Sequence, residues 1–221
     1  MLEPGTTPPR RVYCAGPLFN QAERDEMTTI ADRLCETGYG VYLPHRDGME
    51  FRYVHEVLID QGWPPATAGQ FLHAAIFALD IYQLVEACDS VVWNLNGRTP
   101  DEGAVSEAAI AWALGKPLIA FKEDVRSLIS GRDNPLLAGL VDFQLVQQIA
   151  DIPARLLQVE QQHNTPSNPG RLPAHVQRAT EQGRVLWRVM QQTAAEGDNL
   201  IIAEVVTRLF APSQGETIPT V

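Results

Sequence analysis

Residues 90–122 read SVVWNLNGRTPDEGAVSEAAIAWALGKPLIAFK, and this stretch decides the fold. SVVWNLN is apolar almost throughout, which is typical of a parallel strand buried on both faces. A helical pattern follows from Ala104 to Leu114 and ends before Gly115, a residue that commonly follows the C-terminus of a helix. PLIAFK is a second apolar run, so the stretch predicts a strand, a helix and a strand in succession.

The same alternation extends to both sides of this stretch. Upstream, RRVYCAG and YGVYLP are predicted strands, separated by a helix over 21–36 whose apolar residues recur at three- and four-residue steps. A helix is expected over 70–87 and a short one over 125–129, and LVDFQLVQQ contains a fifth predicted strand. HRDGMEFRYVHEVLIDQGWPPATAG is expected to form a helix or a covering loop. This order predicts an α/β fold in which helices cover both faces of a parallel sheet.

The chain changes in character after residue 150, which suggests three segments. We expect a flexible Pro-rich start over 1–9, an α/β domain over 10–150 and a helical C-terminal extension over 151–221. Within the extension, HNTPSNPGRLP reads as a linker and helices are predicted over 174–195 and 199–210. The second helix is strongly apolar, so it must pack on the main domain or on another subunit.

The composition argues against a nucleic-acid polymer as partner. The 221 residues carry a formal net charge of −10, and their 17 Lys and Arg residues are scattered, whereas a phosphate backbone requires clustered cations. An uncharged small substrate suits this acidity, which plain solubility explains equally well.

The cysteines and the apolar runs bear on localisation. Cys14, Cys35 and Cys88 match no C-x-x-C pair, which indicates reduced thiols and a cytoplasmic protein. The opening MLEPGTTPPR has no apolar core, so no signal peptide is expected. Since we find no run of about 18 apolar residues, no membrane span is expected.

Two carboxylates lie at the start of the central helix, at Asp101 and Glu107. The residues three and four positions from Glu107 offer no salt-bridge partner and are mostly small, which leaves room for a ligand against the carboxylate. They are Gly103, Ala104, Ile110 and Ala111. The helix N-terminus favours an ionised carboxylate, as a nucleophile requires. The alternative is that Asp101 caps the helix and Glu107 is an ordinary surface residue.

Other candidate groups are fewer. Asp80 lies on an otherwise apolar helix, where it serves a site or caps a loop, and Tyr13 ends the first strand, where it reaches the same crevice or belongs to the core. The histidines have no metal-ligand spacing, and we find no phosphate-binding Gly-rich loop and no G-x-S-x-G elbow. We therefore predict no metal and no cofactor.

Four segments together resemble the nucleoside 2-deoxyribosyltransferases. They are VYCAGPLF, LPHRDG, LDIYQLVEACDSVV and DEGAVSEAAIAWALGKP, with weaker matches at EDVR and NPLL. The resemblance covers roughly residues 10–145 and implies a doubly wound, flavodoxin-like sheet. It also implies a deoxyribonucleoside and a free nucleobase as substrates.

The resemblance assigns roles to individual residues. It implies that Glu107 attacks the anomeric carbon of deoxyribose, that Asp80 and Asp101 hold the base and handle its proton, and that Tyr13 orients the nucleophile. Asn134 matches a residue that a neighbouring subunit lends to the sugar site, so a homo-oligomer with shared active sites is expected. The remaining substrate-binding residues implied in this way are Gly16, Pro17, Leu18, Phe19, Asp47 and Gly103.

The sequence departs from the family pattern in three places. Ala109 stands where the family usually has Gly, the segment over 48–75 is long, and the helices after residue 155 are additional. Two other functions stay open. A nucleotide N-hydrolase on the same fold would need phosphate donors in the first loop, which here reads GPLFNQAER. A non-catalytic nucleoside-binding protein would be expected to lack the carboxylates.

Overall fold

The computed structural model describes residues 9–97, 99–124, 133–163, 172–193 and 198–212. The chain divides into two compact units. The first consists of Met1–Asp47 and Gln83–Arg171, and the second of Gly48–Tyr82 and Leu172–Val221. The first unit contains the sheet, and the second is helical.

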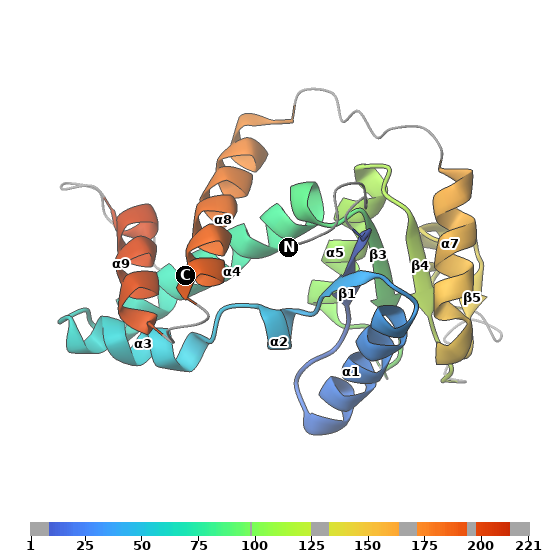
Figure 1. Ribbon diagram of the computed structural model, residues 1–221, viewed down its shortest axis with the longest axis horizontal. Coiled ribbons are helices and arrows are strands. Elements are labelled where there is room, and N and C mark those ends of the chain that lie inside the picture. Colours follow the sequence, from blue (N-terminus) through green and yellow to red (C-terminus); the bar gives the residue numbers. More distant parts are fainter. Residues whose placement is uncertain (1–8, 98, 125–132, 164–171, 194–197, 213–221) are drawn as a thin grey trace, which may run out of the picture. The chain divides into compact units, whose positions relative to one another are not determined.

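Within the described residues, five strands form one parallel sheet in the order β2-β1-β3-β4-β5 (Figure 1). Their bounds are Arg11–Ala15 (β1), Gly40–Tyr42 (β2), Ser90–Asn94 (β3), Leu118–Phe121 (β4) and Leu145–Val146 (β5). This is the flavodoxin-like order, and it confirms the predicted fold class. The order reverses between β1 and β3, so the loops that follow these two strands border the crevice where such folds bind ligands.

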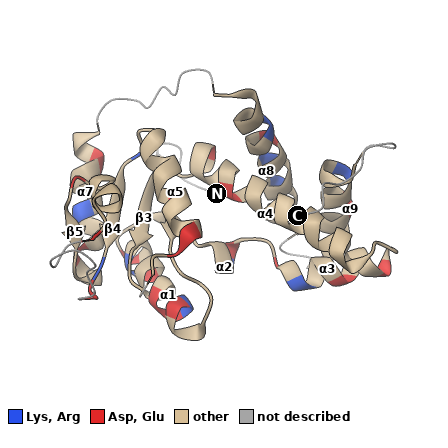
Figure 2. Ribbon diagram, turned by 180° about the vertical axis from the view of Figure 1, so that it is seen from behind, with Lys and Arg blue, Asp and Glu red and all other residues tan. Residues whose placement is uncertain are grey.

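Helices cover both faces of the sheet, with α1 and α7 on one face and α5 on the other (Figures 1 and 2). The alternation of side chains along β1 explains this arrangement. Val12 and Cys14 belong to the core that includes residues of α1 and α7, while Tyr13 reaches α5. The helical elements of this unit are α1 (Gln21–Glu36), α2 (Pro44–Asp47), the π-helix η1 (Gln83–Ala87), α5 (Glu102–Ala113), α6 (Pro135–Gly139), the 3₁₀-helix η2 (Ile149–Asp151) and α7 (Ile152–Gln162).

The second unit consists of α3 (Phe51–Asp60), α4 (Pro65–Tyr82), α8 (Ala174–Thr193) and α9 (Asn199–Phe210). The apolar residues of α9 that required a partner find it here, because Ala203, Val205 and Val206 share one core with residues of α3, α4 and α8. The segment expected to be a helix or a covering loop forms α2, α3 and the start of α4.

The two units follow different boundaries from the expected division at residue 150. Helix α7 begins after that residue, yet Ile152, Leu156 and Val159 belong to the core under the sheet. β5 is shorter than LVDFQLVQQ suggests, because Asp142 and Phe143 adopt positive φ angles of 52° and 60° and turn the chain just before it. The short helix expected over 125–129 lies outside the described residues.

By length and composition, the continuous helical stretch Pro65–Ala87 is long and apolar enough to cross a membrane, which the sequence interpretation did not anticipate. Half of its most apolar 18-residue segment is buried inside the protein. Phe71, Leu72 and Ala75 of α4 pack into the core of the second unit, as expected for the central helix of a helical bundle.

Gly183 marks a close approach of α8 to α4. A Cβ added there would lie 2.0 Å from the carbonyl oxygen of Ala78 and 2.6 Å from Cβ of Tyr82. No side chain fits at that distance, so the two helix backbones approach each other through this glycine.

Gly183→Ala is expected to destabilise the protein by about 1–3 kcal/mol, because the added methyl group forces the backbones apart. Gly69→Ala in α4 is the matched control, since a Cβ there meets nothing within 4 Å and alanine favours a helix by roughly 1 kcal/mol. Denaturant unfolding measures both variants. Equal stability of the two variants would contradict the close packing.

Candidate active site

Tyr13 and Glu107 meet between β1 and α5. The ring of Tyr13 is fully buried, and its hydroxyl donates a hydrogen bond of 2.6 Å to Oε1 of the half-buried Glu107. A phenol that donates to a carboxylate at this length makes a strong, charge-assisted hydrogen bond. Because Tyr13 is held in the core of the sheet, this bond fixes the orientation of the Glu107 carboxylate.

Helix α5 begins at Asp101, which accepts the N–H of Ala104 at 2.7 Å through Oδ1. This is the capping role that the sequence left open. A Cβ at Gly103 would lie 3.2 Å from the same oxygen, so the glycine leaves space beside the capping carboxylate. Glu107 lies on the same helix, six residues after the cap.

The chain after β1 passes through a narrow space at Gly16. A Cβ there would lie 2.3 Å from Sδ of Met27 and 3.0 Å from Cβ of Asn94. Next to it, Pro17 is buried and Leu18 packs against the core, whereas Phe19 is 78% exposed. Of the two apolar residues expected near the sugar, only Phe19 therefore stands clear of the protein core.

A polar network that sequence reasoning missed joins α1 to the end of β3. The carboxylate of Glu26 accepts hydrogen bonds from Nδ2 of Asn94 at 2.6 Å and from Nδ2 of Asn96 at 3.0 Å. Asn94 in turn accepts the N–H of Asn96 at 2.9 Å. The two asparagines at the end of a buried strand indicated a polar site in the sequence. Their partner Glu26 could not be identified in the same way, because it lies about 70 residues away.

The network continues into the loop after β4. Oδ1 of Asn96 accepts the N–H groups of Glu123 and Asp124, and Asp124 accepts the N–H of Gly97 at 2.8 Å. The buried Lys122 pairs with Asp133 at 2.7 Å. The bonds of Asn96 and Gly97 tie the loop that precedes Asp101 to the residues that follow β4.

The remaining predicted residues lie on other elements. Asp47 accepts the N–H of Leu43 at 2.8 Å and a bond from Arg46 at 2.9 Å, which closes the turn after β2. Asn134 is exposed, and its Oδ1 accepts the N–H of Leu136 at the start of α6. Asp80 occupies a half-buried position in the last turn of α4, in the second unit.

The charges around these loops bear on what can bind. Acidic residues (red in Figure 2) occur on α1 and at the start of α5, the helices that follow β1 and β3. The described residues contain no group of three or more His, Cys, Asp or Glu that could hold a metal ion.

Burial raises the pKa of the Cys14 thiol and raises that of Cys88 to about 12, so neither thiol is a ready nucleophile.

Comparison with known proteins gives one family match. A sequence model of the nucleoside 2-deoxyribosyltransferase family matches residues 12–182 of the 221. Among solved structures, a conserved protein from Enterococcus faecalis V583 is 20% identical, covering 68% of this chain and 98% of its own, with a TM-score of 0.48. A 2-deoxyribosyltransferase from Bacillus psychrosaccharolyticus is 18% identical, covering 66% and 95%, with a TM-score of 0.46. No curated protein matches the chain.

Glu26→Ala is expected to loosen the loop before α5, because it leaves the amides of Asn94 and Asn96 without their carboxylate. Hydrogen exchange should speed up roughly tenfold at the N–H groups of Asn96 and Gly97, which corresponds to about 1.4 kcal/mol. Asp25→Ala, at the neighbouring exposed position of α1, is the control. Identical exchange in both variants would show that the network does not hold the loop.

Proposed function

This chain belongs to the nucleoside 2-deoxyribosyltransferase family, and we propose that it transfers 2-deoxyribose between nucleobases through a covalent bond to Glu107. The observation that carries the proposal is the 2.6 Å hydrogen bond from Tyr13 to Glu107. A nucleophilic carboxylate must approach the anomeric carbon from one direction, and a donor fixed in the sheet core provides that orientation.

In the proposed reaction, a carboxylate oxygen of Glu107 forms a bond to C1′ of the deoxyribose. The glycosidic C1′–N bond breaks at the same time, and its electron pair leaves with the nucleobase. A nitrogen of a second base then attacks C1′, and the bond to Glu107 breaks and restores the carboxylate. Two inversions give net retention, by the same logic as in retaining glycosidases.

The leaving base needs a proton or a hydrogen bond as its negative charge develops. We assign this task to Asp101 and Asp80, as the resemblance implies. The carboxyl group that gives its proton to the leaving base regains one from the N–H of the second base as that base attacks C1′. Asp101 stands at the N-terminus of α5, where its oxygen is already positioned by the N–H of Ala104.

The first loop favours a nucleoside without a 5′-phosphate. Arg24 is the first cation after β1, and its Nη1 donates to the carbonyl oxygen of Leu18 at 3.0 Å, within the loop itself. The exposed Phe19 is apolar. An acidic surface with an apolar contact suits an uncharged deoxyribonucleoside better than a nucleotide.

The proposal extends to the assembly and the cellular role. Asn134 is exposed next to Leu136, which is 78% exposed, so both are available to a neighbouring copy of the chain. We therefore propose a homo-oligomer in which Asn134 serves the sugar site of the adjacent subunit. The role proposed is nucleoside salvage in the cytoplasm.

Incubation with deoxyinosine and adenine tests the function directly. Chromatography should show hypoxanthine and deoxyadenosine, and mass spectrometry of the quenched protein should find a deoxyribosyl group on Glu107. Glu107→Gln should lower the rate by about 10³-fold or more. Glu102→Gln, exposed on the same helix, should leave the rate unchanged.

Other outcomes of this assay decide against the proposal. Hypoxanthine with free deoxyribose, and no deoxyadenosine, would identify a hydrolase. Saturable binding without any product would identify a nucleoside-binding protein.

Asp101→Asn separates the capping role from the proton role, because asparagine caps a helix as well as aspartate does but does not donate an acidic proton. We expect a loss of roughly 10²–10⁴-fold in turnover for Asp101→Asn and for Asp80→Asn. The loss should shrink for substrates whose base is a good leaving group. Equal losses for good and poor leaving groups would argue against proton transfer.

A further inference from the structure

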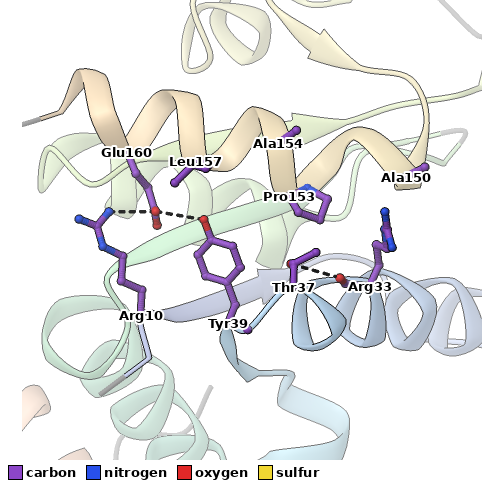
Figure 3. Close-up of a pocket in the computed structure, with 10 residues that line it drawn as sticks. Arg10, Arg33, Thr37, Tyr39, Ala150, Pro153, Ala154, Leu157 and Glu160 are labelled. Atoms are coloured by element: carbon purple, nitrogen blue, oxygen red, sulfur yellow. Dashed lines mark hydrogen bonds and ion pairs between the residues drawn. The ribbon is translucent and has the colours of Figure 1, made fainter. Parts of the chain in front are cut away.

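A cavity opens between α7 and the C-terminal end of α1 (Figure 3). Its volume is about 520 Å³, within the range of roughly 300–1,000 Å³ usual for small-molecule sites. Arg10 comes directly before β1 and Tyr39 directly before β2, so the cavity lies at the amino ends of these strands. Gly16, Asn94 and Asp101, by contrast, lie at or after the carboxyl ends.

The wall contributed by α7 is apolar. Pro153 and Leu157 line it, and Leu157 is 49% exposed although it is a large aliphatic residue. The ring of Tyr39 stands across from this helix and points toward Glu160 (Figure 3). Together, these side chains offer a contact surface for a flat apolar ring.

The charge of Glu160 is already compensated. Its Oε2 pairs with Arg10 at 2.9 Å and accepts the Tyr39 hydroxyl at 3.1 Å, and its Oε1 accepts the Ser90 hydroxyl at 2.9 Å. Burial and Glu160 raise the pKa of Tyr39 to about 12, so its phenol stays neutral and adds no negative charge to the cavity.

Arg33 is the residue of this cavity that favours a negatively charged ligand. Its Nε is buried and has no hydrogen-bond partner among the residues that the structure describes. Its Nη1 pairs at 3.1 Å with Glu36, a largely exposed side chain that does not line the cavity. Two arginines and one fully bonded glutamate line the cavity, so its charge is positive in a chain whose net charge is −10.

We propose that this cavity is a second binding site, which takes a small molecule that carries a carboxylate or phosphate on a flat, apolar ring. The anionic group binds the guanidinium of Arg33, whose side chain is 40% exposed and lines the cavity. The ring lies against Pro153 and Leu157, across from Tyr39. The requirement for a negative charge distinguishes this ligand from the uncharged nucleoside proposed at the carboxyl edge.

Calorimetric titration of the full chain tests the site with four probes: adenosine 5′-monophosphate, benzoate, adenosine and inorganic phosphate. The first two carry the anion and the ring, and the other two carry only one of these features. We expect binding of adenosine 5′-monophosphate, benzoate or both, weakened about 10- to 100-fold by Arg33→Ala. Arg155→Ala is the control, because Arg155 lies on α7 outside the cavity lining.

A pair of charge substitutions at Leu157 separates electrostatics from loss of packing. Leu157→Glu and Leu157→Lys disturb the exposed apolar wall to a similar extent. The Kd of the ring-bearing anion should be at least tenfold higher for Leu157→Glu than for Leu157→Lys, because the added negative charge repels the anion.

Three results would overturn the proposal. They are no binding of either ring-bearing anion, binding unaffected by Arg33→Ala, or binding of phosphate and adenosine that depends on Arg33 and is as tight as that of the ring-bearing anions. Because the readout is binding, the test is independent of whether deoxyribosyl transfer is observed.

Discussion

The hydrogen bond between Tyr13 and Glu107 is the constraint on which the proposed active site depends. It joins a fully buried strand residue to a half-buried helix residue 94 positions later in the chain. The strand provides rigidity, because β1 lies between β2 and β3 in the sheet. The helix gives a ligand access to the carboxylate, because α5 follows β3, next to the point where the strand order reverses. A carboxylate held in this way reaches its substrate in a defined orientation, with little loss of conformational freedom on binding.

The surrounding polar groups hold the loop that leads to this helix. Glu26 bonds two asparagines beside the end of β3, and Asp124 bonds the glycine that follows them. Each of these contacts joins elements that are far apart in sequence but neighbours at the carboxyl edge. The amino edge of the same sheet holds the cavity around Arg33, so one small α/β unit presents two chemically different surfaces.

The sequence predicted the sheet because each strand is a short apolar run between helical patterns, and it predicted the bounds of α1 and α9 from periodicity and end signals. The proximity of Tyr13 to Glu107 was expected from the resemblance. The Glu26 network was not, because nothing local to Glu26 distinguishes it from the acidic residues beside it. The place of α7 under the sheet was also missed, since an amphipathic pattern shows that a helix packs but not against which partner.

Gly16 carries a consequence for how relatives of this chain can diverge. The space that a side chain would need at residue 16 is filled by the sulfur and methyl group of Met27, one turn and a half into α1. Residues 16 and 27 are therefore coupled in packing. A homologue with alanine or serine at the first position needs a different rotamer or a shorter residue at the second, so we expect the two positions to covary across the family, together with Asn94 at the end of the third strand.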